Sequence, residues 1–222
     1  MWTVWNIGSV ATLLAAVALA LVLLVPLSAA AYRLPRSLDD AISSTPSVAH
    51  RHWRKGVLIA GMMLAMLCAW RFGPTPAAVV AIVYTLVLLT LAWIDAETGF
   101  LPDMLTIPLL WMGLLVNMDD TFAVLGHAVV GAVAGYMVLW SISGLFLLVA
   151  GRQGMGHGDF KLLAALGAWL GWMSLPWVLI ISSSLALVIA FVQRLRGRLD
   201  AKASFSFGPY LAVAGIVVLL RL

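Results

Sequence analysis

Two aspartates stand beside apolar runs in a chain that carries few charges. Asp95 directly follows the apolar run 75–94, and Asp159 directly precedes the run 160–173, after glycines at 154, 156 and 158. An aspartate inside a membrane helix costs about 2.5–3.5 kcal/mol on insertion scales. Such residues usually face protein or a water-filled cavity and mark a functional path. Both aspartates are therefore candidates for chemistry, although they lie 64 residues apart in the chain.

Two carboxyl groups that face each other in a low-dielectric cleft cannot both ionise easily, so the pair shares one proton. The ionised member can activate water as a base, and the protonated member can protonate a carbonyl or a leaving amine. This is the chemistry of aspartic proteases, and it needs no metal ion, cofactor or covalent intermediate. Structural interpretations are equally open at this point. Asp159 can be a helix N-cap, and Asp95 can be a boundary carboxylate paired with an Arg or Lys.

The backbone next to both aspartates is expected to turn sharply. Gly156 and Gly158 allow close backbone approach or positive φ, neither of which a simple cap requires. Pro102 and Asp103 are typical of a tight turn that is followed by an abrupt helix start. These glycines and this turn favour the functional interpretation of the aspartates.

Further ionisable residues lie close to the two aspartates in the sequence. Glu97 and Asp103 either line the site or stay solvated. Lys161 either pairs with the carboxylates or reaches the lipid headgroups. His157 stands in no metal-binding pattern, so we expect no metal site.

The composition excludes several classes of protein. Of the 222 residues, 64% are hydrophobic and 10% are charged, and the mean hydropathy is +1.08. Soluble domains are about 45–50% apolar and about 25% charged, so a soluble enzyme, a disordered tail and a coiled coil are ruled out. The net charge of +4 is what positively charged cytoplasmic loops produce, and we expect membrane lipid rather than nucleic acid as the surroundings of this chain.

The apolar runs predict an all-α, polytopic bundle of eight transmembrane helices that forms a single domain over residues 1–222. The runs are 8–32, 56–71, 75–94, 104–117, 122–150, 160–173, 175–193 and 206–222. The runs 104–117 and 160–173 are short for a full span, which is tolerated where a helix end lines a polar cavity. The stretch 33–55 is expected to be a short cytoplasmic loop.

The distribution of basic residues sets the expected orientation. The first 32 residues contain no Lys or Arg, which is the wrong charge order for a cleaved signal and indicates a retained helix. With both termini outside, the cytoplasmic stretches are 33–55, 95–103, 151–161 and 194–205. They hold eleven of the thirteen basic residues. The positive-inside rule therefore supports eight spans, with Asp95 and Asp159 at the same cytoplasmic face.

The strings that surround the aspartates resemble the type IV prepilin peptidases, which belong to the GxGD class of intramembrane aspartic proteases. Residues 156–159 read Gly-His-Gly-Asp, and the longer strings 155–171 and 94–115 also resemble this family. A third similarity lies at 207–212, which includes Gly208 and Pro209. The resemblance covers residues 75–222 well and the N-terminal part loosely.

This resemblance implies that Asp95 and Asp159 are the catalytic pair of an endopeptidase in the bacterial inner membrane. It also implies a substrate that is a prepilin or pseudopilin of a type IV pilus or secretion system. The short basic leader of such a substrate stays in the cytoplasm, and its apolar stem is a membrane helix. Cleavage is expected after a glycine at the cytoplasmic boundary, where a helix end frays most readily.

The sequence departs from the family in its N-terminal part. Many members have two CxxC pairs that bind zinc in the first cytoplasmic loop, whereas 33–55 contains no cysteine. The family's Tyr-Arg-Leu-Pro string is present at 32–35, but the residues before it do not match the usual GSFLN-like string. That region is linked to S-adenosylmethionine-dependent N-methylation, so these departures speak against methyltransferase activity.

Two other functions use the same carboxylates. A proton-coupled transporter employs buried acids as proton relays, and it predicts flux driven by a pH gradient and inverted repeats, which the sequence does not display. A metal-dependent membrane transferase would use Asp95, Glu97 and Asp159, and it predicts loss of activity with a chelator.

Overall fold

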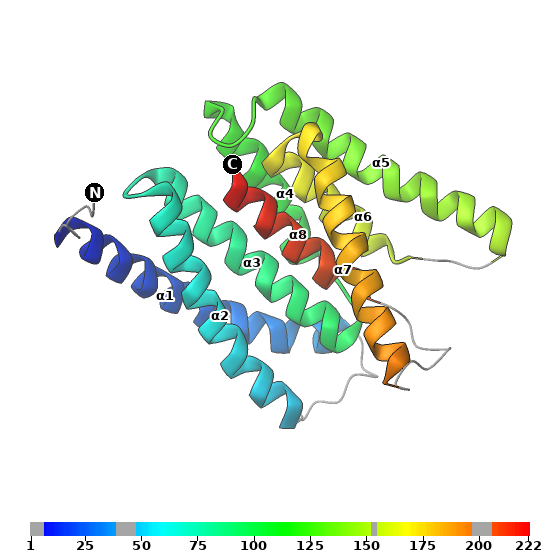
Figure 1. Ribbon diagram of the computed structural model, residues 1–222, viewed down its shortest axis with the longest axis horizontal. Helices are drawn as coiled ribbons and strands as arrows, with labels where there is room; N and C mark the ends of the chain where they lie inside the picture. Colours follow the sequence, from blue (N-terminus) through cyan, green and yellow to red (C-terminus); the bar gives the residue numbers. More distant parts are fainter. Residues whose placement is uncertain (1–6, 39–47, 152–154, 197–205) are drawn as a thin grey trace.

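The computed structural model describes residues 7–38, 48–151, 155–196 and 206–222, and within these ranges it contains helices and no strand. The all-α prediction is therefore confirmed (Figure 1). The helices are α1 (Ile7–Leu38), α2 (Val48–Phe72), α3 (Pro76–Thr98), α4 (Asp103–Val116), α5 (Leu125–Ala150), α6 (His157–Leu170), α7 (Leu175–Leu195) and α8 (Gly208–Arg221). Two short 3-10 segments, η1 (Asn117–Asp119) and η2 (Trp172–Ser174), follow α4 and α6.

Helix length divides the bundle into two groups. Five described helices are long and apolar enough to cross a membrane, namely those over Val10–Ser37, Arg54–Phe72, Pro76–Thr98, Leu125–Val149 and Trp172–Leu195. The other three helices, α4, α6 and α8, have 14 residues each. At about 1.5 Å per residue, such a helix is about 21 Å long, which is less than the roughly 30 Å of a hydrocarbon core.

Helix covers both ends of the predicted cytoplasmic loop 33–55. α1 continues to Leu38 with Pro35 inside it, and α2 begins at Val48. The end of an apolar run marks where the chain becomes polar, whereas a helix continues as long as its backbone bonds can form. The middle of this predicted loop, residues 39–47, lies outside the described residues. So do the basic residues at 152, 198 and 202, and Gly154.

α3 also continues beyond its apolar run. The run ends at Ile94, but the helix continues for another turn to Thr98, so Asp95 and Glu97 both lie on the helix. Gly99 then ends the helix in a left-handed conformation with φ of 66°, and its N–H donates to the Asp95 carbonyl. A left-handed residue at this position is the common glycine C-cap.

α5 and α6 approach each other closely through glycine. A Cβ atom at Gly131 would meet the backbone oxygen of Gly167, and one at Gly135 would lie 2.6 Å from the Leu163 carbonyl oxygen. Small residues at these crossings let two apolar backbones approach, which is how membrane helices gain packing energy. This contact fixes α6 along most of its length, and α6 carries Asp159.

Buried polar contacts fix the far end of α6. The side chain of Asn117 donates to the carbonyls of Ala168 and Trp169 at 2.8 and 2.9 Å. The Trp169 indole N–H in turn donates to the Leu109 carbonyl of α4 at 2.8 Å. These bonds satisfy carbonyls at a helix C-terminus that would otherwise be buried without partners. α4 and α6 are thereby joined at the end opposite Asp159.

The close α5–α6 crossing can be tested with two alanine substitutions on one helix. We expect Gly131→Ala to destabilise the protein by about 1–3 kcal/mol, because the added methyl group overpacks the contact. Gly144→Ala is the matched control, since no atom lies within 4 Å of a Cβ at that position. Thermal unfolding in detergent micelles measures both. Equal melting temperatures for the two variants would contradict this packing.

Candidate active site

Asp95 is buried in the last two turns of α3, with a side chain that is 5% exposed. The Ser206 hydroxyl donates to Asp95 Oδ2 and also contacts the Asp95 carbonyl oxygen at 3.2 Å. A Cβ atom at Gly208 would meet Oδ2 of the same carboxyl group. The segment that leads into α8 therefore packs directly against this carboxylate, and only glycine fits at position 208.

Asp159 is the third residue of α6 and is 7% exposed. It is not the N-cap, which is Gly156, although the Gly156 N–H interacts with the Asp159 carboxylate. Its Oδ1 atom is buried and has no hydrogen-bond partner among the described residues. A buried polar atom without a partner calls for an explanation, and an attacking water or a substrate carbonyl could supply that partner.

Burial is the main cause that raises the pKa of the Asp159 carboxyl group to about 7. The negative charge of Asp95 acts in the same direction, and the Gly156 N–H opposes it. Asp159 lies outside the five candidate spans. A carboxyl group with this pKa is largely protonated in slightly acidic solution and can donate a proton.

Asp95 and Asp159 line the same pocket, which has a volume of about 280 Å³. Tertiary packing therefore brings two residues that are 64 positions apart to the same pocket. Other predicted residues that line this pocket are Gly156, Gly158, Asp103 and Lys161. His157 also lines it, and in the described part of the chain no group of three His, Cys, Asp or Glu side chains could hold a metal ion.

A larger cavity of about 760 Å³ lies at the opposite end of α3, against α1 and the end of α2. Its described lining is almost entirely apolar and has no ionisable side chain. Of these two cavities, only the smaller pocket has carboxyl groups in its described lining.

Four of the predicted site residues are not in the lining of the pocket. Gly208 packs against Asp95, and the other three lie beside the pocket. Glu97 forms an ion pair with Arg36 of α1 at 3.6 Å, so it connects α1 to the helix that carries Asp95. Pro102 is the N-cap of α4. Pro209 occupies the first turn of α8, directly after Gly208, where its missing N–H would have no helical partner.

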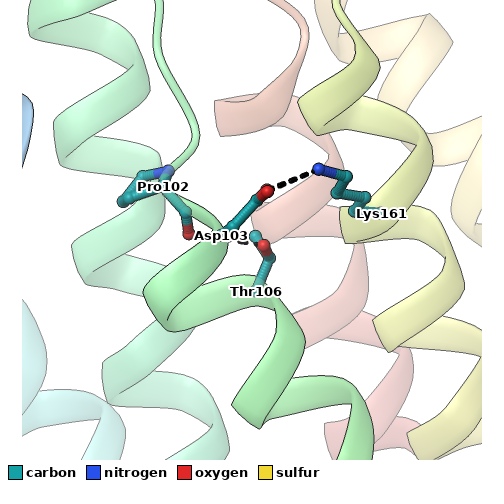
Figure 2. A network of polar contacts seen from close by, with 4 residues as sticks. All are labelled: Pro102, Asp103, Thr106 and Lys161. Carbon is teal, nitrogen blue, oxygen red and sulfur yellow. Dashed lines mark hydrogen bonds and ion pairs between the residues drawn. The ribbon is translucent and has the colours of Figure 1, made fainter. Parts of the chain in front are cut away.

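Lys161 pairs with Asp103 rather than with Asp95 or Asp159. Its ammonium group lies 2.7 and 2.6 Å from the two Asp103 oxygens (Figure 2). The sequence left open whether Lys161 would pair with the candidate catalytic carboxylates or reach the lipid headgroups. The structure shows a third partner, Asp103.

Two contributors to the site carried no signal in the sequence. Ser206 belongs to a common residue type and lies 111 positions from Asp95, so nothing in its local pattern indicated the contact. Leu101, which lies between Asp95 and Asp103 in the sequence, also lines the pocket. A Cβ atom at Gly158 would lie 2.7 Å from the Leu101 Cβ, which accounts for the glycine at that position.

The three short helices all begin at this pocket. Asp103 is the first residue of α4, His157 is the first residue of α6, and both line the pocket, while α8 begins at Gly208 against Asp95. A helix N-terminus carries a partial positive charge. Three such ends therefore favour a negative charge in the pocket, which offsets part of the cost of burying two carboxyl groups.

Comparison with known proteins places these observations in a family. Residues 82–191 match the model of the Type IV leader peptidase family. No solved structure matches the chain.

Curated relatives are named prepilin leader peptidase/N-methyltransferase. The relative from Burkholderia pseudomallei is 48% identical over 164 residues, which are 74% of this chain and 51% of the relative. The relative from Aeromonas hydrophila is 48% identical over 71% of this chain and 54% of its own length. The relative from Pseudomonas aeruginosa is 44% identical over 74% of this chain and 57% of its own length. The chain spans about half the length of the curated relatives it matches.

Asp95 and Asp159 both fall within the segment that the family model matches, and the relatives retain nearly half of the residues over most of this chain. The chain belongs to the Type IV leader peptidase family.

Proposed function

We propose that this protein is a membrane aspartic endopeptidase that removes the short basic leader from prepilins or pseudopilins. The observation that carries the proposal is the pocket in which Asp95 and Asp159 are buried together. Family membership favours this function over a proton-coupled transporter and over a metal-dependent transferase. The proposal does not extend to N-methylation, because the departures from the family lie in the N-terminal region linked to that activity.

In the proposed mechanism the two carboxyl groups divide the acid and base roles. Asp95, which accepts the Ser206 hydroxyl and lies against Gly208, is the ionised base that takes a proton from water. The water oxygen bonds to the scissile carbonyl carbon while protonated Asp159 gives its proton to the carbonyl oxygen. The C–N bond then breaks as Asp95 gives its proton to the leaving amine. Asp159 takes back a proton from one hydroxyl of the diol, which becomes the new carboxyl group, and both aspartates return to their starting protonation. Each transfer is general acid–base catalysis, which contributes about 10²- to 10⁴-fold to a rate.

We propose an inner-membrane location with eight spans, both termini outside and the pocket facing the cytoplasm. Exposed basic residues support this orientation, because Arg54 and Lys55 lie at the start of the apolar span of α2, and Arg194 and Arg196 lie at the end of α7. Under alternating topology these ends lie on the side where α3 ends, which is the side of Asp95. Basic residues concentrate on the cytoplasmic side of a membrane. A leader that stays in the cytoplasm would reach the pocket from this side.

Removing either carboxyl group should abolish cleavage while the protein still folds. We expect Asp95→Asn and Asp159→Asn each to lower the rate by at least about 10²-fold, since each removes one partner of the acid–base pair. The assay follows cleavage of a purified prepilin by the detergent-purified protein. Asp119→Asn is the control, because Asp119 is exposed after α4. Wild-type rates in either site variant would overturn the proposal.

The pH dependence of cleavage reports the proton on Asp159. The pKa of about 7 means that Asp159 loses its proton as the pH rises through this value. We therefore expect the cleavage rate to fall above about pH 7, and to be unaffected by a chelator. A metal-bound hydroxide would give the opposite trend, with a rate that rises with pH and is lost when the chelator is added. That result would exclude the two-carboxylate mechanism.

The glycine against Asp95 offers a test that leaves both carboxyl groups in place. We expect Gly208→Ala to reduce cleavage by about tenfold or more, because the added methyl group would meet Asp95 Oδ2 and displace it, and small displacements of catalytic groups are costly. Gly144→Ala, with open space around its Cβ, should cleave at the wild-type rate. Unimpaired cleavage by Gly208→Ala would show that this contact does not position Asp95.

A further inference from the structure

The ion pair between Lys161 and Asp103 connects two of the short helices that meet at the pocket. Lys161 lies in the second turn of α6, and Asp103 is the first residue of α4, 58 positions earlier in the chain. Both Asp103 oxygens accept from the same ammonium group (Figure 2). Both side chains also line the pocket that contains Asp95 and Asp159.

The Asp103 side of this pair is the better anchored one. The Thr106 hydroxyl donates to the Pro102 carbonyl at 3.3 Å, and the Thr106 N–H donates to the same carbonyl at 3.2 Å (Figure 2). These bonds fix the first turn of α4. The negative charge of Asp103 at a helix N-terminus is favoured by the helix dipole. α4 therefore presents Asp103 as a fixed acceptor to α6.

A second contact between the same two segments lies on the other side of Asp159. Gly158 lies so close to Leu101 that a Cβ atom would come within 2.7 Å of the Leu101 Cβ. Asp159 thus stands between Gly158, which abuts the turn before α4, and Lys161, which is bound to the start of α4. The first two turns of α6 are therefore held at two positions, one against the turn before α4 and one against α4 itself.

This ion pair contributes little to the stability of the fold. The side chains of Lys161 and Asp103 are 33% and 53% exposed, and partly exposed pairs contribute little to the free energy of unfolding. A bidentate contact nonetheless restricts how α6 can slide or rotate relative to α4. Because Asp159 lies two residues from Lys161, such a movement would carry Asp159 away from Asp95, and small displacements of a catalytic group cost up to about 100-fold in rate.

We propose that Lys161 and Asp103 are positioning residues, whose ion pair holds the start of α6 against α4 so that Asp159 faces Asp95. The pair acts on cleavage through the placement of Asp159 and touches neither the reacting water nor the scissile bond. For its effect on cleavage, this inference rests on the proposed function.

The experiment compares steady-state cleavage of a purified prepilin by Lys161→Met, Asp103→Asn and the double variant. We expect each single variant to lower kcat by about 10- to 100-fold with a nearly unchanged KM. The double variant should be no slower than the slower single variant, because one shared contact is lost in all three. Lys161→Arg keeps the pair and should retain at least half of the wild-type kcat. Lys55→Met and Asp119→Asn, both exposed away from the pocket, are the controls.

The pH profile separates positioning from a direct effect of charge on Asp159. The charged or titratable groups that line the pocket with Asp159 are Asp95, Asp103, His157 and Lys161. If Lys161 and Asp103 acted by charge, removing the positive group and removing the negative group would shift the pH profile in opposite directions. Positioning predicts lower kcat in both variants and a shift of the profile to lower pH in both, because Asp159 moves away from the charge of Asp95 that raises its pKa. Opposite shifts, multiplying losses in the double variant, or a raised KM with unchanged kcat would each overturn the inference.

Hydrogen exchange gives a readout that does not depend on the proposed activity. In Lys161→Met and Asp103→Asn, we expect faster amide exchange over residues 155–162 and 99–106 than in the wild type and the two controls. Unchanged exchange would refute the positioning role even if cleavage were never observed. Faster exchange without cleavage by the wild type would retain the structural pair and reject the proposed function instead.

Discussion

Two acidic side chains must remain close together inside an apolar bundle, and most of the local structure holds them there or lowers the cost of burying them. Burial and mutual repulsion both oppose ionisation of the pair. The described surroundings reduce this cost without neutralising the pair by a direct cation. Asp95 accepts from the Ser206 hydroxyl, the Gly156 N–H faces Asp159, and three helix N-termini converge on the pocket. The nearby lysine is engaged by Asp103, which leaves the shared proton to the two aspartates.

α6 connects packing contacts far from the pocket to the position of Asp159. Its middle is held by the close approach of Gly135 to Leu163, and its far end by Gly131 and Asn117. Its first two turns are held by the contact of Gly158 with Leu101, just before α4, and by the ion pair of Lys161 with Asp103. A 14-residue helix that is fixed along its length can present a carboxyl group at a defined depth. The short helices therefore begin at the polar pocket, beside the end of α3, and lead from it into the apolar core.

The sequence predicted those parts of the site that are costly to place in a membrane. Asp95 and Asp159 could be identified because a charged residue beside an apolar run is costly to place in a membrane and usually has a function. Gly158 could be identified because glycine lets two backbone segments approach closely. Partners across the fold could not be identified in this way. The bonds from Ser206 to Asp95 and from Lys161 to Asp103 join residues 111 and 58 positions apart, and no local period encodes them. The sequence also did not predict that α1 ends at Leu38 and α3 at Thr98. Hydropathy marks where the chain leaves the apolar part of the membrane, whereas a helix ends where its backbone hydrogen bonds end.

The central claim is that Asp95 and Asp159 share one pocket and respond to each other's charge. Carbon-13 NMR of the purified protein, labelled at the aspartate carboxyl carbons, measures this directly, with the Asp159 resonance assigned by its loss in Asp159→Asn. The account predicts a midpoint near pH 7 in the wild type and a lower midpoint in Asp95→Asn, because loss of the neighbouring negative charge eases ionisation. A midpoint that does not move in Asp95→Asn, or one at about 4 in the wild type, would contradict it.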